Sequence, residues 1–148
     1  MSLVIDANIV AALVLPLPYS DQATWRVAAW KKAGTVLYAP ILLEYEVLTI
    51  LRKATTNGWL TTELAAEAME TVSTLNIQCQ LPSLELHEQA LCWAERLGHS
   101  KTYDAHYLAL ADQLRAELWT ADRRLTNGAQ QAGAVWVHWI GESEQALP

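Results

Sequence analysis

Cysteines are few in this chain, and long apolar runs are missing. Cys79 and Cys92 are the only cysteines, and their spacing matches neither a zinc site nor a redox pair. We therefore expect two buried free thiols in a reducing cytoplasm. No apolar run approaches the roughly 20 residues that span a bilayer, so no membrane segment is expected. The first residues, Met1 to Asp6, lack the basic region of a signal peptide and reach an acid at once, which favours a cytoplasmic protein.

Basic residues and phenylalanine are also scarce. Ten Lys and Arg stand against 16 Asp and Glu, giving a net charge of −6. This balance argues against a protein that binds nucleic acid by bulk charge alone. It does not exclude a nuclease, because an acidic site filled with divalent cations attracts phosphate. Phenylalanine is absent, and we expect the seven tryptophans to fill the core instead.

What is present suits one folded domain spanning residues 1–148. The chain is 52% hydrophobic and long enough for a single buried core. Short apolar runs alternate with helical patterns, which predicts an α/β fold: a three-layer α/β/α sandwich around a mainly parallel sheet. We expect strands at Leu3–Ile5, Val36–Ala39, Ile77–Leu81, Leu118–Thr120 and Val135–Ile140. We expect helices at Asp21–Lys32, from Pro40 to about Thr56, from Thr61 or Thr62 to Leu75, at Leu84–Leu97 and Tyr103–Arg115, and from Asp122 to near Gly128.

Three acids follow from this arrangement as candidates for a site. Asp6 and Asp122 come directly after predicted buried strands, and the carboxyl ends of parallel strands form the crevice where ligands bind. Two carboxylates there repel each other and need protons, basic partners or metal ions. Asp104 opens a helix that is apolar nearly all round, where the positive helix end favours an ionised acid. Each acid alone also has a structural explanation as a cap or turn residue, but their joint placement favours a site.

Glu44 and Glu46 compete for a fourth position. Residues three, four and seven positions apart share one face of a helix, which puts Glu44 beside four apolar residues, Ile41, Val47, Leu48 and Leu51. Glu46 lies about 200° further round the helix. We therefore predict that Glu44 faces the crevice and that Glu46 faces water.

Four segments resemble the PIN domain family. They are Val4–Asn8 (VIDAN), Pro40–Leu48 (PILLEYEVL), Tyr103–Ala111 (YDAHYLALA) and Leu118–Leu125 (LWTADRRL), in the family's order and across nearly the whole chain. The pairing of YDAHYLALA with TADRRL carries most of the resemblance. The size of the chain resembles VapC-type toxins of toxin–antitoxin pairs.

The resemblance implies a Mg²⁺- or Mn²⁺-dependent endoribonuclease. It implies that Asp6, Asp104 and Asp122 hold a metal directly, that Glu44 acts on a second ion or its water, and that the products carry a 5′-phosphate and a 3′-hydroxyl. Oxygen-only ligands suit such hard cations. The resemblance also implies a cognate antitoxin and a homodimer.

Further residues near these motifs have two interpretations each. Asn8 positions a water or finishes the turn after Asp6, and Thr120 matches a family hydroxyl position near the metal but is also a good strand residue. Arg123, Arg124 and Arg52 bind the RNA backbone or are solvated surface charges.

Two other functions compete with the nuclease. A phosphatase that forms an aspartyl-phosphate requires a second acid two residues after the nucleophile, and here that position is Asn8. A PIN-like interaction module with weak or no nuclease activity stays open. Mn²⁺-dependent RNA cleavage that is lost in Asp104→Asn would separate it from a nuclease.

Overall fold

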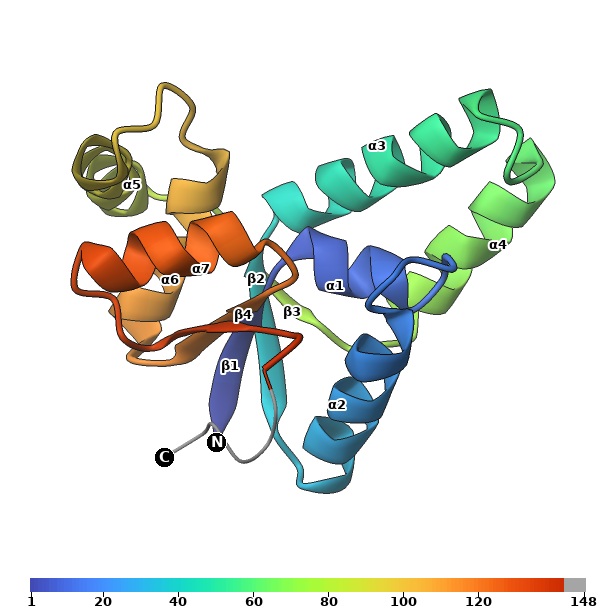
Figure 1. Ribbon diagram of the computed structural model, residues 1–148, viewed down its shortest axis with the longest axis horizontal. Helices are drawn as coiled ribbons and strands as arrows, with labels where there is room; N and C mark the ends of the chain where they lie inside the picture. The colour runs from blue at the N-terminus through green and yellow to red at the C-terminus, as the bar shows by residue number, and fades with distance from the viewer. Residues whose placement is uncertain (143–148) are drawn as a thin grey trace.

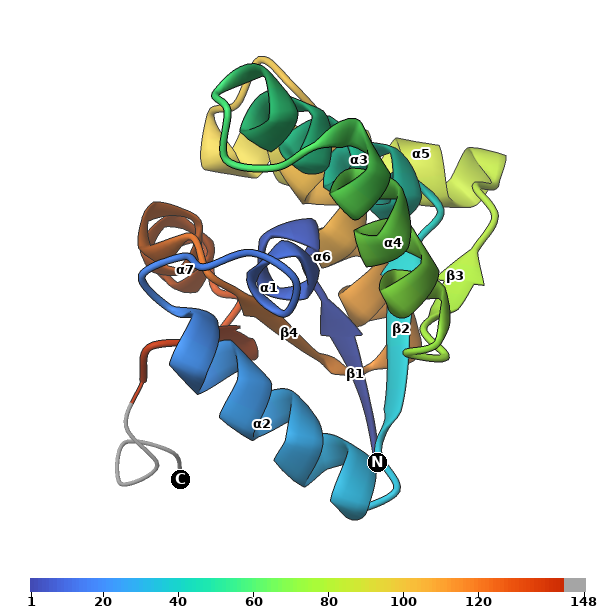
Figure 2. The same cartoon turned by 90° about the vertical axis from the view of Figure 1, so that its right-hand side faces the viewer.

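The computed structural model describes residues 1–142 and shows a five-stranded sheet with helices on both faces (Figures 1 and 2). The strands are β1 (Ser2–Ile5), β2 (Val36–Pro40), β3 (Gln78–Gln80), β4 (Glu117–Thr120) and β5 (Val137–Trp139). Their order in the sheet is β3-β2-β1-β4-β5, and every neighbouring pair is parallel. The predicted three-layer α/β/α architecture is confirmed.

The helices connect the strands and cover the sheet. They are α1 (Ala7–Ala12), α2 (Ser20–Lys32), α3 (Leu42–Thr56), α4 (Thr62–Ser73), α5 (Leu84–Leu97), α6 (Tyr103–Leu114) and α7 (Arg123–Gln131). Helices α3 and α4 form an arm that extends away from the sheet (Figure 1). Helix α1 was not predicted. Its six residues are too few to show a helical period, and all except Asn8 are buried.

Local chemistry sets several of the helix ends. The hydroxyls of Thr61 and Ser83 accept the backbone N–H groups that begin α4 and α5, as N-caps do. Gly98 ends α5 with φ 69°, a left-handed conformation that glycine adopts without strain.

Two predicted helix ends were wrong. Pro40 was expected to open a helix, but it is the last residue of β2, and α3 begins at Leu42. Proline offers no N–H to the sheet, and the pairing with β3 continues through the Ile41 N–H, which donates to the Gln80 carbonyl at 3.0 Å. Helix α7 also passes through Gly128 instead of ending there.

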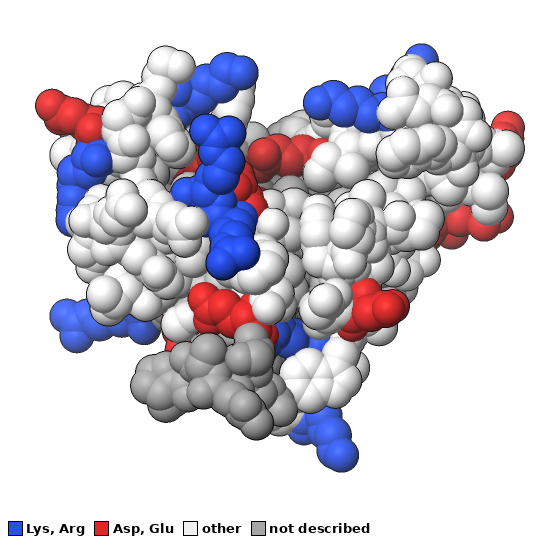
Figure 3. All heavy atoms as spheres, in the orientation of Figure 1, with Lys and Arg blue, Asp and Glu red and all other residues white. Residues whose placement is uncertain are grey.

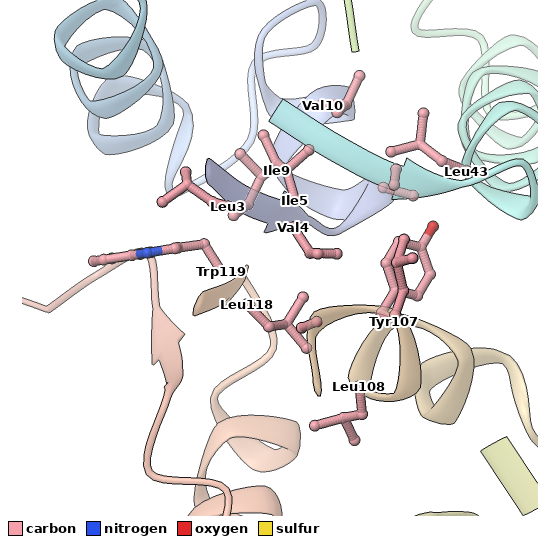
Figure 4. Packing of buried hydrophobic residues seen from close by; sticks show 14 of the residues in the cluster. Leu3, Val4, Ile5, Ile9, Val10, Leu43, Tyr107, Leu108, Leu118 and Trp119 are labelled. Atoms are coloured by element: carbon pink, nitrogen blue, oxygen red, sulfur yellow. The ribbon is translucent and has the colours of Figure 1, made fainter. Parts of the chain in front are cut away.

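The core lies on both sides of β1, whose residues Leu3, Val4 and Ile5 are fully buried. Val4 points toward α6, whereas Ile5 lies on the side of α1 with Ile9 (Figure 4). Burial on both faces explains why this strand is a continuous apolar run.

The tryptophans fill the core only in part. Trp119 and Trp93 are buried, and the Trp119 ring lies 5.3 Å from that of Trp30. Trp25 and Trp59 are instead more than half exposed, at 52% and 65%.

Both cysteines are free. Cys79 is half-buried, but Cys92 is exposed, so the expected burial was wrong for Cys92. It lies on the outer side of α5, whose buried residues include Ala90 and Trp93. No helix in residues 1–142 is long and apolar enough to cross a bilayer.

Candidate active site

The ends of β1 and β4 place Asp6 beside Thr120. The two strands are parallel neighbours, and the Asp6 N–H donates to the Trp119 carbonyl at 3.0 Å. The Asp6 side chain is only 5% exposed. Its carboxylate accepts the Ala7 N–H at 2.7 Å, which caps α1, and the Thr120 hydroxyl at 2.8 Å. Asp6 is therefore a buried acid held by two donors.

Thr120 joins three polar groups at this edge of the sheet. While its hydroxyl donates to Asp6, its oxygen accepts the Asp122 N–H at 3.1 Å and the Asn8 side-chain amide at 3.2 Å. The Asn8 carbonyl oxygen in turn accepts the Ala121 N–H at 3.0 Å. Thr120 and Asn8 therefore connect the end of β1 to the end of β4, and the side-chain amide of Asn8 holds the turn after β4 in place.

Asp122 begins α7 and is exposed. Its Oδ1 accepts the N–H groups of Arg124 and Leu125 at 2.9 and 3.1 Å, so the acid is also a helix N-cap. The cap and site interpretations of Asp122 are compatible, because one carboxylate oxygen makes both of these bonds.

Asp104 lies in the first turn of α6 and is partly buried. Burial raises the pKa of its carboxyl, repulsion from Asp122 raises it further, and the neighbouring His99 opposes these effects. The carboxylates of Asp104 and Asp122, which are distant in sequence, therefore lie within electrostatic reach of each other.

The fourth acid at this place is Glu46, not Glu44. Glu46 Oε1 accepts the hydroxyl of the buried Tyr107 at 2.8 Å. Burial raises the pKa of Glu46, and repulsion from Asp104 adds to this, against the lowering effect of the Tyr107 hydrogen bond. Glu44 is exposed and lines a different hollow together with Cys79. The pKa of Cys79 is raised mainly by burial and to a smaller extent by the charge of Glu44.

The prediction that Glu44 faces the crevice was therefore wrong. Helix α3 begins after Ile41, and its buried stripe is Leu43, Val47, Leu51 and Ala54. Glu46 precedes Val47 directly and lies one turn beyond Leu43, which brings it beside α6. Leu48, which seemed to extend the apolar side of Glu44, is 53% exposed.

Burial is the main influence on the pKa of Asp6, and the neighbouring acids add to it. Burial raises its pKa to about 7, with further increases from Asp104 and Glu46 and a lowering by the hydrogen bond from Thr120. Tyr19, in the loop between α1 and α2, has a pKa raised by burial, Asp6 and Asp122. No motif in the sequence pointed to Tyr19, and only the fold reveals its proximity.

A hollow of about 440 Å³ adjoins these acids. Glu46 and Asp104 line it together with Tyr103 and the α5–α6 loop, which includes His99 and Lys101. In Figure 3, acidic groups lie between basic side chains that belong to the regions of α7 and the α5–α6 loop on one side and to the region of α3 on the other.

The arginines named from the sequence lie outside this hollow's lining. The Arg123 guanidinium carbon lies 4.8 Å from the centre of the Trp139 ring, and Arg124 is exposed beside Asp122. Arg52 is exposed on α3 and donates to the Thr55 hydroxyl at 3.0 Å.

The donor set fits a hard divalent cation. The candidate ligands are carboxylate oxygens, which Mg²⁺ and Mn²⁺ prefer. The acids of the set whose pKa values are raised, Asp6, Glu46 and Asp104, would be relieved of repulsion by a cation. Within residues 1–142 no three His, Cys, Asp or Glu side chains converge into a ready-made metal centre.

Comparison with known families assigns the chain to one of them. The PIN domain family model matches residues 3–130, and the chain belongs to the PIN domain family. A relative from Pyrobaculum aerophilum, named Ribonuclease VapC3, is 33% identical over 130 residues, which cover 84% of this chain and 92% of the relative.

Solved structures share the fold. PAE2754 from Pyrobaculum aerophilum gives a TM-score of 0.62 at 22% identity, covering 86% of this chain and 84% of that one. A toxin–antitoxin complex from Klebsiella pneumoniae gives 0.63 at 20% identity, covering 95% and 99%. VapC20 from Mycobacterium tuberculosis, described as a toxin that cleaves the sarcin–ricin loop, gives 0.66 at 19% identity, covering 84% and 93%.

Proposed function

We propose that this chain is a Mg²⁺- or Mn²⁺-dependent endoribonuclease that hydrolyses RNA phosphodiester bonds. The observation that carries the proposal is the buried Asp6 at the end of β1, whose pKa is raised to about 7 by burial and by the nearby acids Asp104 and Glu46. A protein retains such a costly cluster of carboxylates when a bound cation offsets the cost. The curated relative named as a ribonuclease supports the same reaction.

The four acids take distinct roles in this proposal. Asp6, Asp104 and Asp122 hold the cation, and Glu46 takes the role expected of Glu44, on a second ion or its water. A bound cation supplies a water of lowered pKa and stabilises charge on the phosphate. Thr120 orients the Asp6 carboxylate through its hydroxyl. Hydrolysis leaves a 5′-phosphate and a 3′-hydroxyl.

Asp104→Asn tests the reaction. The amide keeps the size of the side chain and removes its charge, so Mn²⁺-dependent cleavage of single-stranded RNA should fall by about a hundredfold or more. Asp112→Asn is the matched control, because Asp112 is an exposed acid of the same helix and lines a different hollow. Equal cleavage by both variants would contradict the proposal.

One observation favours the alternative, a PIN-fold interaction module with weak or no nuclease activity. The described acids do not form a ready-made metal centre. A wild-type chain that cleaves no RNA at millimolar Mn²⁺ would establish this alternative.

We also propose a toxin role with a cognate antitoxin. The toxin–antitoxin complex and the VapC relatives among the similar proteins support it. An antitoxin that inserts a basic side chain among the acids would neutralise their repulsion and block the cation. Cleavage should then stop when the product of the neighbouring reading frame is added.

A homodimer is the last part of the proposal. The exposed apolar residues Leu64 on α4 and Leu84 and Leu91 on α5 offer surface for it, whereas Trp93 on α5 is buried. Sedimentation at micromolar concentration should show a species of twice the 16.5 kDa chain mass, and a monomer alone would refute it.

A further inference from the structure

Tyr103 stands between two hollows of different chemistry. On one side it lines the hollow of about 440 Å³ that contains Glu46 and Asp104. On the other side it lines a groove of about 200 Å³ together with Tyr45 and Leu86. Tyr103 is 54% exposed although it begins a helix that is otherwise central to the core. An aromatic side chain at this position offers a ring face directly beside the acids.

Lys101 brings a positive charge to the same place. It is exposed on the α5–α6 loop and lines the hollow that contains Glu46 and Asp104. A nuclease with a net charge of −6 needs local cations, because the acids would otherwise repel the RNA backbone near the site. Lys101 is such a cation on the wall of the hollow, which the arginines named from the sequence do not line.

The loop that carries Lys101 is tied to α6 at its end. His106 Nδ1 lies 2.7 Å from the Thr102 carbonyl oxygen and so donates to it. The other ring nitrogen of His106 shares a hydrogen bond with His87 Nδ1 at 2.8 Å, which links the start of α6 to α5. The paired histidines therefore hold the segment around Lys101 and Tyr103 against the helices on both sides.

We propose that Lys101 and Tyr103 form a nucleotide subsite for single-stranded RNA. Lys101 pairs with a backbone phosphate next to the bond that is cut, and the adjacent base stacks on the Tyr103 ring at the mouth of the groove. This inference rests on the proposed ribonuclease function. Bases that are splayed out of a helix stack on aromatic side chains, whereas bases in a duplex are not free to do so. The subsite therefore selects unpaired RNA.

The kinetics of two variants test the subsite. Tyr103→Leu keeps an apolar side chain and removes the ring, so KM should rise about tenfold, the scale of losing one stacked base, while kcat changes less. Tyr103→Phe keeps the ring and should restore most of this loss. Lys101→Ala should raise KM and reduce the slope of log KM against log salt by about 0.7, the share of one phosphate contact on a single strand.

Matched controls lie elsewhere on the surface. Trp59→Leu removes another exposed aromatic residue, and Lys32→Ala removes an exposed lysine at the end of α2. Both should leave KM unchanged. Wild-type KM values for Tyr103→Leu and Lys101→Ala would overturn the subsite, because neither the ring nor the charge would then contact the RNA.

Binding separates this inference from the proposed reaction. In the Asp104→Asn background, a single-stranded RNA carrying 2-aminopurine should lose fluorescence on binding, because the base stacks, and Tyr103→Leu should abolish the change. This result would support the subsite even if the wild-type chain cleaved no RNA. Active cleavage with no change in fluorescence for a label at any position would refute the subsite and leave the reaction standing.

Discussion

Two glutamates only two residues apart have opposite surroundings. Glu46 meets Tyr107 and feels Asp104, whereas Glu44 is exposed at another hollow. Glu46→Gln should therefore cut RNA cleavage about a hundredfold, the scale of losing one positioned electrostatic group. Glu44→Gln should stay within about twofold of wild type, as surface changes usually do. Cleavage of one RNA at saturating Mn²⁺ measures both, and the reverse order would mean that Glu46 has no role.

The single hydroxyl of Thr120 has several hydrogen-bond partners. Thr120→Val would remove one of the two donors to Asp6 and leave the Asp122 N–H without its side-chain acceptor, in a position that is fully buried. We expect the free energy of unfolding to fall by about 1–3 kcal/mol. The pKa of Asp6 should rise further, because the hydrogen bond from Thr120 lowers it.

Urea unfolding and a pH profile of cleavage measure these two effects. Cleavage should rise with pH as Asp6 loses its proton. In Thr120→Val this rise should occur at a higher pH than in the wild type. Thr120→Ser keeps the hydroxyl and should retain the wild-type profile. A valine variant with an unchanged profile would show that the hydroxyl does not act through Asp6.

At this scale the expected proximity of Asp6, Asp104 and Asp122 agrees with the structure, whereas the expected direction of Glu44 does not. The neighbourhood of Asp6 and Asp122 follows from their places after strands of a parallel sheet, which a sequence pattern reveals. The choice between Glu44 and Glu46 depends on which side of α3 faces α6. Both acids have apolar neighbours at helical spacing, so only tertiary packing distinguishes them.

A hydrogen bond from Tyr107 to Glu46 links helix α6 to helix α3. The Tyr107 hydroxyl is buried and donates to the Glu46 carboxylate at 2.8 Å. Tyr107→Phe should lower the free energy of unfolding by about 1–3 kcal/mol, since a bond to a charged group is lost. It should also raise the pKa of Glu46 and weaken cleavage, because the acid loses its support.

Thermal unfolding and cleavage by Tyr107→Phe measure this coupling between helices. Tyr38→Phe, at a half-buried position of β2, is the control for removal of a tyrosine hydroxyl elsewhere. Should Tyr107→Phe keep full activity, the position of Glu46 would be set by α3 alone.

Helices were predictable from the sequence where they were long enough to show a helical pattern of apolar residues. Helix α5 has the predicted bounds, Leu84–Leu97, because Ser83 and Gly98 mark both ends chemically. Helix α1 stayed hidden because it follows β1 after the single residue Asp6 and its six residues are too few to show a helical period. At Pro40 the same residue type suits a strand end and a helix start, and pairing with β3 decided between them.

At the scale of the whole molecule, four acids from distant parts of the chain gather at one edge of the sheet, and this placement couples the stability of the fold to pH. The pKa of Asp6 is about 7 in the folded chain and near the ordinary value of 3.8 when unfolded. Between these values the folded state holds the extra proton, so the metal-free chain should lose stability as pH rises from about 4 to about 7. Above that window the loss is complete, on the order of 4 kcal/mol from this group.

A cation that binds only the folded acids should reverse this loss. At pH 5.5 Mn²⁺ competes with the proton on Asp6, whereas at pH 7.5 the proton is largely gone, so millimolar Mn²⁺ should raise Tm more at pH 7.5. Thermal unfolding at matched ionic strength measures the shift. Asp6→Asn should flatten the metal-free dependence on pH and remove most of the Mn²⁺ effect, because it carries neither the proton nor the charge. An equal Mn²⁺ shift at both pH values, or one no larger than that of added salt, would mean that Asp6 is not a ligand and that its buried carboxyl serves the fold alone.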